Sequence, residues 1–325
     1  IKAIPGGVEK AYQIAQANNK FSMGDMKMNF TTSSFWVILL YGFFMNLNNF
    51  GMDQNYVQRY HTASSDKEAK KSIWLCVYMY VPASLLFFII GSALFSFYSL
   101  HPELTEVLKQ TAAAERLGLN ASSTQVNELA STMQPTDYGD KVLPHFMVNH
   151  VPKVFLGLII AAILSAGMST ISSGMNACAT VFSKDIYKRY FKPDLTGKAE
   201  LRLLHIGTIV FGLIGLGTGL AMLGIKSVLD VWWLLSGIFA GGMLGLFLLG
   251  IMSRQTKGGQ ALAAVVVGIL VILWLTFSPE LPADFGYLRS SLHINMVIVV
   301  GTLVILFAGV LLTQLKNKLK INTKK

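Results

Sequence analysis

Seven long apolar runs constrain this chain more than any other feature of its sequence. They lie near residues 34–57, 72–98, 154–183, 203–224, 228–252, 258–278 and 292–315. A helix that crosses a bilayer needs about 20 mostly apolar residues, and none of the runs alternates as a membrane β-strand does. Only 14% of the residues are charged, whereas a soluble domain has about 25%. The sequence therefore predicts an all-α membrane protein with seven transmembrane helices.

Basic residues are distributed unevenly between the loops that join these runs. Of the 27 Lys and Arg residues, 17 lie in the set formed by 58–71, 184–202, 253–257 and 316–325. Because Lys and Arg concentrate on the cytoplasmic side, we expect this set inside the plasma (inner) membrane, with a basic cytoplasmic tail at 316–325. Residues 1–33 and 99–153 then form external loops. The basic residues are scattered between apolar runs, so the net charge of +10 does not indicate nucleic-acid binding.

This orientation gives the chain an external amino terminus of 33 residues that no signal sequence precedes. Upstream transmembrane segments would place that terminus outside. We therefore expect a missing amino-terminal half of the same protein as a partner of this chain.

The third run carries many hydroxyl groups in the stretch SAGMSTISSGMN, residues 165–176. Ala166, Ser169, Thr170 and Ser173 have the spacing of residues that share one helix face. Hydroxyl and carbonyl oxygens without a carboxylate suit a hard monovalent cation. Close helix packing, with Ser and Thr bonded to their own i−4 carbonyls, explains the same residues. The residues alone leave both interpretations open.

Three amides, Asn46, Asn48 and Asn49, lie deep in the first run. An amide in hydrocarbon needs partners for two donors and an acceptor, so either a polar-substrate site or an interhelical amide bond fits. Asn and Gly are poor helix formers, and we expect the helix to kink or unwind here. Asp53 lies further along, where it can act as a local cap or pair with Arg59.

Three stretches of the sequence resemble the sodium/solute symporter family, which includes the sodium/glucose cotransporters. They are SAGMSTISSGMNACATVFSKDIYK, NFGMDQNYVQRY and GGMLGLFLLGIMSRQTKGGQALAAVVVG. The family fold has two inverted repeats of five helices, with substrate and sodium between them. The resemblance implies that 34–252 forms the second repeat (core helices 6–10, with the external loop 99–153). It also implies that 253–315 adds two peripheral helices, and that the first repeat is absent from this chain.

The resemblance assigns the hydroxyl-rich helix to sodium. The common sodium site of the family would take the carbonyl of Ala166 and the hydroxyls of Ser169 and Thr170. A second sodium, present in some relatives, would use Ser169 with Ser172 and Ser173. Sodium is then the one bound ion that the sequence predicts.

The resemblance to sugar-transporting relatives is weaker on the substrate side. Asn46 matches their sugar-binding Asn, with Asn48 as a polar neighbour. Asn49, Tyr80 and Trp233 stand where those relatives have an aromatic gate, a Lys and a Gln. Taken alone, Tyr80 is typical of packing, and Trp233 is typical of an interfacial anchor.

The resemblance predicts a sodium-coupled symporter that imports a small polar organic solute, a sugar or sugar derivative. The departures on the substrate side leave a sodium-coupled carboxylate or sugar-acid carrier as an alternative. A membrane sensor built on the same fold is a further alternative. No spacing of nucleophile, base or metal ligands indicates an enzyme.

Overall fold

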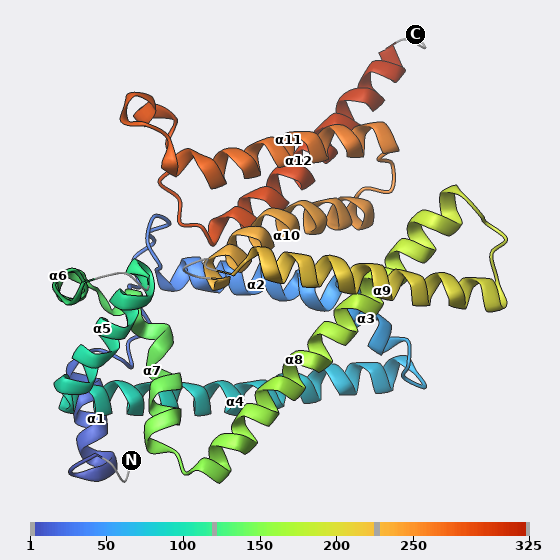
Figure 1. Cartoon of the computed structure of the whole chain (residues 1–325). Helices are drawn as coiled ribbons and strands as arrows, with labels where there is room; N and C mark the ends of the chain where they lie inside the picture. Colours follow the sequence, from blue (N-terminus) through green and yellow to red (C-terminus); the bar gives the residue numbers. More distant parts are fainter. Residues whose placement is uncertain (1–3, 119–121, 224–227, 323–325) are drawn as a thin grey trace. The chain divides into compact units, whose positions relative to one another are not determined.

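The computed structural model describes residues 4–118, 122–223 and 228–322, and within these ranges every regular element is a helix (Figure 1). The elements are α1 (Gly7–Ala17), α2 (Phe35–Met52), α3 (Gln54–Tyr60), α4 (Asp66–Leu100), α5 (Pro102–Leu117), α6 (Ser123–Thr132), α7 (Pro135–His150), α8 (Lys153–Val181), the π-helix η1 (Phe182–Lys188), α9 (Gly197–Ala221), α10 (Val228–Met252), α11 (Gly258–Phe277), the short 3₁₀ helices η2 (Ser278–Glu280) and η3 (Ala283–Leu288), and α12 (Met296–Asn322).

Seven of these helices are long and apolar enough to cross a membrane: α2, α4, α8 with η1, α9, α10, α11 and α12. Each coincides with one of the predicted apolar runs, so the all-α, seven-span prediction is confirmed. The ends differ most at α4, α9 and α12, where charged residues continue the helix past the apolar run. The chain divides into two compact units: Ile1–Ser22 with Ser65–Ile171, and Met23–Ser64 with Ser172–Lys325.

Glycine lets α10, α11 and α12 approach closely in the second unit. A Cβ on Gly245 would lie 2.9 Å from the carbonyl oxygen of Thr302, and one on Gly268 would overlap Ile305. Small residues allow such approach between membrane helices, where dispersion contacts replace the hydrophobic effect. Thr302 is buried here and donates to the Gly241 carbonyl at 3.3 Å. These three helices therefore form a packed bundle.

The first membrane helix of the second unit, α2, packs on this bundle through one face. Val37 and Phe44 are buried against Leu244 of α10 and Ile298 of α12. At its start, the Ser34 hydroxyl accepts from the Val37 amide and donates to the Asn29 carbonyl at 2.6 Å. This cap satisfies one of the free amides of the first turn.

The first unit contains more helix outside the membrane spans than the sequence predicts. Residues 1–33, expected as an external loop, include α1, which packs on α4 and accepts a hydrogen bond at the Ala11 carbonyl from the Ser96 hydroxyl at 2.9 Å. Apolar spacing in this amphipathic segment gives it a face to bury, and the face lies against Phe97 and Leu108.

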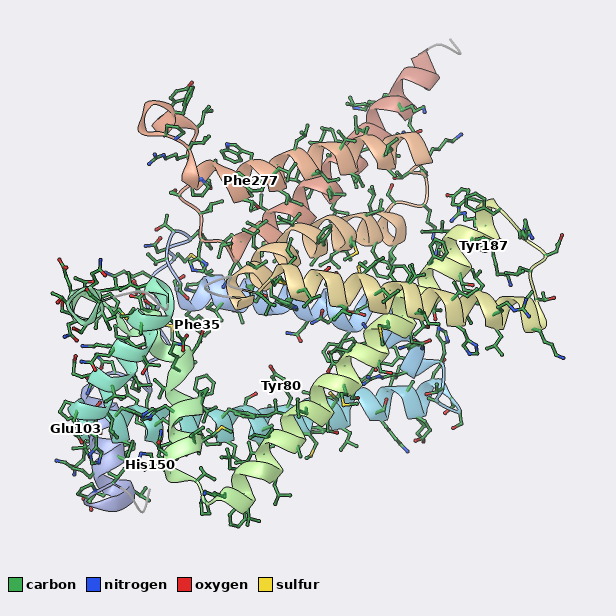
Figure 2. All side chains as sticks on the ribbon, in the orientation of Figure 1. Phe35, Tyr80, Glu103, His150, Tyr187 and Phe277 are labelled. Atoms are coloured by element: carbon green, nitrogen blue, oxygen red, sulfur yellow. The ribbon has the colours of Figure 1, made fainter. Side chains whose placement is uncertain are left out.

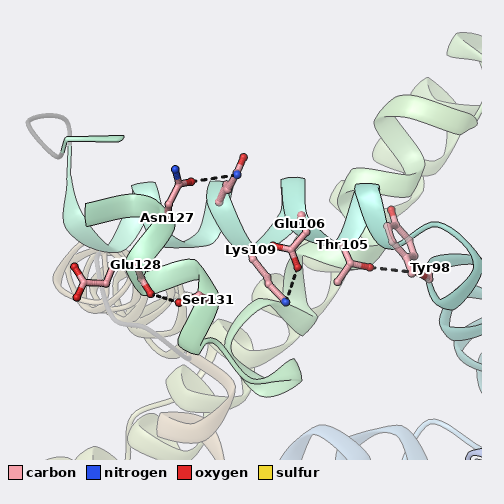
Figure 3. A network of polar contacts seen from close by, with 8 residues as sticks. Tyr98, Thr105, Glu106, Lys109, Asn127, Glu128 and Ser131 are labelled. Carbon is pink, nitrogen blue, oxygen red and sulfur yellow. Dashed lines mark hydrogen bonds and ion pairs between the residues drawn. The ribbon is translucent and has the colours of Figure 1, made fainter. Parts of the chain in front are cut away.

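Three helices, α5, α6 and α7, occupy the predicted external loop 99–153. Polar contacts tie them together: Gln110 of α5 donates to Asn127 of α6 at 3.2 Å, in the network drawn in Figure 3. Arg116 of α5 pairs with Asp137 of α7 at 2.7 Å. Alternating charged and apolar positions along these helices provide a small core on one side and these pairs on the other.

Candidate functional site

The hydroxyl-rich stripe lies on an unbroken stretch of α8. Because the helix is continuous from Lys153 to Val181, Ala166, Ser169, Thr170 and Ser173 share one face as their spacing requires. The segment 161–172 is exposed throughout, and Ser173 is half-buried. None of the most apolar stretch of this helix is buried. The stripe is therefore a polar face that no side chain of its own unit covers.

Hydrogen bonding on the stripe leaves oxygen lone pairs free. The Thr170 hydroxyl donates to the Ala166 carbonyl at 3.0 Å, as Ser and Thr often do within helices. That bond uses the hydroxyl proton and leaves the lone pairs of Thr170 available. The side-chain hydroxyls of Ser169, Ser172 and Ser173 make no hydrogen bond within the described ranges. The local geometry thus satisfies the donor of Thr170 and leaves acceptor lone pairs on the hydroxyls, which is compatible with a cation; the i−4 bond itself is equally expected from the packing interpretation.

The three amides of α2 divide between two faces of the helix. Asn46 is exposed, and its Nδ2 donates to the Gly42 carbonyl at 2.7 Å. Asn48 is 6% exposed on the face that packs against the bundle, and its Oδ1 has no partner among the described residues. Asn49 is half-buried. Only Asn46 therefore faces away from the protein core.

The expected kink at these amides is wrong. The helix continues through them to Met52. The Asn46 side-chain amide bonds to the Gly42 carbonyl of the same helix and leaves the helix unbroken. The break comes at Asp53, whose backbone is extended and whose carboxylate caps α3 by accepting from the Asn55 amide at 2.8 Å. The two helices are joined by a cap, and no Asp53–Arg59 ion pair forms in the described structure.

A groove of about 750 Å³ runs along the exposed face of α2. Its wall is apolar except for Asn46 and the hydroxyls of Ser33 and Ser34 at the start of the helix. Phe43 and Phe50 flank Asn46 in this wall. A few polar groups in a mostly apolar concave wall are typical of small-molecule sites. Of the three candidate amides, Asn46 is the one in this groove.

The structure describes the side chain of only one of the two aromatic candidates, Tyr80 and Trp233. Tyr80 is 72% exposed on α4, in the first unit, two positions before Pro82 (Figure 2). The side chain of Trp233 lies outside the described part of the structure, and only its place on α10 is known. Its neighbour Trp232 is half-exposed.

A charged cluster that the sequence interpretation missed follows α8 directly. The chain changes to the π-helix η1 over Phe182–Lys188, and both Lys184 and Lys188 pair with Glu200 of α9, the latter at 3.2 Å. The Glu200 side chain is only 16% exposed. The signal in the sequence is the i, i+4 pair of lysines followed by an acid in the first turn of the next helix. This cluster joins the end of the hydroxyl-bearing helix to α9.

Comparison with known proteins decides the family. A sequence profile described as "Sodium:solute symporter family" matches residues 6–268, which is most of the chain. The chain belongs to this family. Membership confirms the resemblance stated from the motifs, and this symporter-family chain is an integral membrane protein of a transporter family rather than an enzyme.

The relatives of this symporter-family chain include two sialic acid symporters. The sodium/sialic acid symporter NanT of Aliivibrio fischeri is 30% identical over 303 residues, covering 92% of this chain and 54% of that protein. SiaT of Proteus mirabilis is 28% identical, covering 92% and 55%. A solved structure of a Na⁺-coupled sialic acid symporter, substrate-bound and outward-open, has a TM-score of 0.72 and 27% identity over 96% of this chain and 57% of that one. The chain spans about half the length of the curated relatives it matches.

Proposed function

We propose that this chain supplies the sodium-binding helix and part of the solute site of a sodium-coupled symporter. The observation that carries the proposal is the stripe on α8 in a member of this family. There the Thr170 hydroxyl donates a hydrogen bond to the Ala166 carbonyl and keeps its own lone pairs. Sodium is a hard ion that prefers such oxygens. The carbonyl of Ala166 and the hydroxyls of Ser169 and Thr170 would hold it, and Ser172 and Ser173 would serve a second ion.

The proposed solute is a sugar acid. The two relatives named above transport sialic acid, which carries both hydroxyls and a carboxylate, and this favours the sugar-acid alternative over a neutral sugar. In the α2 groove, Asn46 would bond a solute hydroxyl while Phe43 and Phe50 contact the apolar face of the ring. Asn49, Tyr80 and Trp233 remain proposed contacts. Asn48 would act in packing, since its side chain is buried on the opposite face.

Transport would follow from differential affinity. Sodium at the α8 stripe favours the conformation that binds solute better, and by reciprocity the solute raises the affinity for sodium. The protein itself forms no covalent bond in this cycle. Its residues bind and release the two ligands and exclude water from them.

We also propose that an amino-terminal half of the same protein covers the exposed faces of α4 and α8. The most apolar stretches of both helices are unburied, and the relatives are about twice as long as the matched chain. Residues 1–325 expressed alone should then give no sodium-driven uptake in vesicles. Uptake at the rate of the full-length protein would exclude this part of the proposal. The loop charges support a cytoplasmic carboxyl terminus as part of this proposal.

A sodium titration tests the proposed function. In full-length protein reconstituted in proteoliposomes, Thr170→Val keeps the side-chain shape but deletes the oxygen. We expect the half-saturating sodium concentration for sialic acid uptake to rise about 5- to 150-fold, which corresponds to roughly 1–3 kcal/mol for a lost buried partner. Thr170→Ser keeps the oxygen and should titrate as the parent does.

The matched control is Thr218→Val. Thr218 makes the same i−4 bond on an exposed helix face, to the Ile214 carbonyl at 2.9 Å, but lies on α9 outside the stripe. Its loss should leave the sodium titration unchanged. If Thr170→Val and Thr218→Val both titrate like the parent, the stripe serves packing and the sodium assignment fails.

A further inference from the structure

One end of the α10–α12 bundle collects positive charge with no acidic residue near it in sequence. Arg254 and Lys257 lie in the turn between α10 and α11, and Lys316 and Lys318 lie on the last turns of α12; all four are exposed. Lys320, Lys324 and Lys325 follow in the sequence. No Asp or Glu occurs in residues 231–279 or 285–325. We call the first four residues the basic end of the bundle.

Hydrogen bonds hold the two parts of the basic end together. Asn317 donates to the Gln255 side chain at 2.8 Å, and the hydroxyls of Thr256 and Thr313 are 2.9 Å apart. The Gln260 amide reaches the Leu312 carbonyl at 3.5 Å. The turn and the end of α12 therefore form one surface, and the four cations are presented from a fixed base.

Other basic segments of the chain contain acidic residues that pair with some of their lysines. Lys71 pairs with Glu68 at 2.8 Å, and Lys184 and Lys188 share Glu200. Among the described residues, none of the four cations of the basic end forms an ion pair with an acid. The tendency of cytoplasmic loops to carry Lys and Arg explains their sign. It does not explain why the two basic segments here lack acids, whereas 58–71 and 184–202 contain them.

The helix α12 carries this charge to the membrane surface. Its length, Met296–Asn322, corresponds to about 40 Å at 1.5 Å per residue, more than the roughly 30 Å of a hydrocarbon core. Leu311 and Leu315 are half-exposed just before the lysines, and Ile251 and Met252 are exposed just before Arg254. An apolar band followed at once by long cationic side chains matches the boundary between acyl chains and headgroups.

We propose that the basic end of the bundle is a binding surface for anionic phospholipid headgroups. Four fixed cations without acidic neighbours complement phosphate charge, and the adjoining apolar residues contact the first methylenes of the acyl chains. Each Lys or Arg near an anionic membrane surface raises the association constant about fivefold. This proposal does not depend on the transport proposal.

The test is lipid retention by the purified full-length protein in nanodiscs of phosphatidylglycerol and phosphatidylcholine, counted by native mass spectrometry. The double variants Lys316→Gln/Lys318→Gln and Arg254→Gln/Lys257→Gln should each lower the apparent affinity for phosphatidylglycerol by about 30-fold. Lys316→Arg/Lys318→Arg keeps the charge and should retain the parent affinity. Phosphatidylcholine retention should not change in any variant.

The matched control is Lys67→Gln/Lys70→Gln, which removes the same charge from two exposed lysines at the start of α4, next to Asp66 and Glu68. It should lower the affinity by less than about twofold. An equal fall in the control would show that total charge matters and the surface does not, and would overturn the proposal. So would full retention by both bundle variants. With the parent alone, raising NaCl from about 0.05 to about 0.5 M should release phosphatidylglycerol selectively; salt-independent retention would also contradict the proposal.

Discussion

Two sets of membrane helices in this chain treat their polar residues in opposite ways. In the α10–α12 bundle, more than half of the most apolar stretch of α12 is buried. The two threonines of α12 bond inside the bundle: Thr302 donates to the Gly241 carbonyl at 3.3 Å and Thr313 to the Gly309 carbonyl at 2.7 Å. In α8 none of the corresponding stretch is buried, and the side-chain hydroxyls of Ser169 and Ser172 make no hydrogen bond in the described structure. Both sets contain small and hydroxyl residues, so composition does not distinguish them.

The difference separates packing from binding. Where glycines and hydroxyls serve packing, a neighbouring helix already fills the space around them, as Ile298 does at Gly241. Where they serve binding, the space opposite them belongs to something else. Around Gly157 and Gly167 of α8, no side chain and no other described helix lies within 4 Å of the place that a Cβ would take. Substitutions that fill space should therefore harm the bundle and spare α8.

The largest expected effect is on a glycine of the bundle. In Gly245→Val the new Cβ would lie 2.9 Å from the Thr302 carbonyl oxygen and 2.8 Å from the Cβ of Ile305. Backbone cannot give way as a side-chain tip can, so we expect a loss of about 3 kcal/mol in the free energy of unfolding. The melting temperature of residues 1–325 in detergent measures it, because the proposed amino-terminal half would cover α8 in the full-length protein. Gly157→Ala on α8 should be neutral or slightly stabilising, because alanine favours helix; equal melting of the two variants would contradict the comparison.

The next effect contrasts the two faces of α2. Asn46→Ala should raise the apparent solute constant by about 5- to 150-fold, or roughly 1–3 kcal/mol, because the proposed solute loses a buried partner. Asn48→Leu replaces an amide with an unpartnered buried oxygen by an apolar group of similar size, so stability should hold or rise. Uptake kinetics and melting curves, both normalised to folded protein, separate the two. A change of solute constant in Asn48→Leu alone would reverse the assignment.

These two asparagines also show what the sequence can and cannot predict. Apolar run length predicted all seven spans, and the spacing of Ala166, Ser169 and Thr170 placed them on one helix face. Which of Asn46 and Asn48 faces the core depends on the docking of α2 against α10 and α12, which local pattern does not encode. Asn also has low intrinsic helix propensity, which predicted a kink. Packing of the helix face overrode that propensity.

The helices outside the spans were missed for a related reason. Both α1 and α6 are short, and short helices owe their stability to the surface on which they pack rather than to their own residues. Their apolar faces become meaningful only once partners such as Phe97 are in place. The sequence also did not predict the π-helix η1, in which Lys184 and Lys188 both reach Glu200.

A smaller effect is expected at that acid, where α8 ends. Glu200→Gln removes the charge that both lysines share, and because the Glu200 side chain is only 16% exposed we expect a larger loss of stability than for an exposed pair. The readout is again the melting temperature. Glu68→Gln breaks the exposed Glu68–Lys71 pair on α4 and should cost about 0.3 kcal/mol. If the two variants lose equal stability, the Glu200 cluster does not fasten the end of α8.

The smallest expected effect is a dependence of stability on acidic pH. Residues 231–279 and 296–322 of the α10–α12 bundle cannot contribute to it, because they contain no Asp or Glu. At the start of α5, the backbone amide of Glu103 and then its contact with His101, at 3.0 Å, hold the pKa of the Glu103 carboxyl below its ordinary value of 4.5. A carboxylate whose pKa is lower in the folded state stabilises the fold above its unfolded pKa, and that stabilisation disappears as the pH falls through the folded pKa. Glu103→Gln should therefore melt slightly below the parent at about pH 6, and the gap should close as the pH is lowered from about 4.5. Taking the difference between parent and variant removes the contribution of other carboxylates, which titrate equally in both. A gap that stays constant from about pH 6 to about pH 3 would mean that Glu103 contributes through its shape and not its charge.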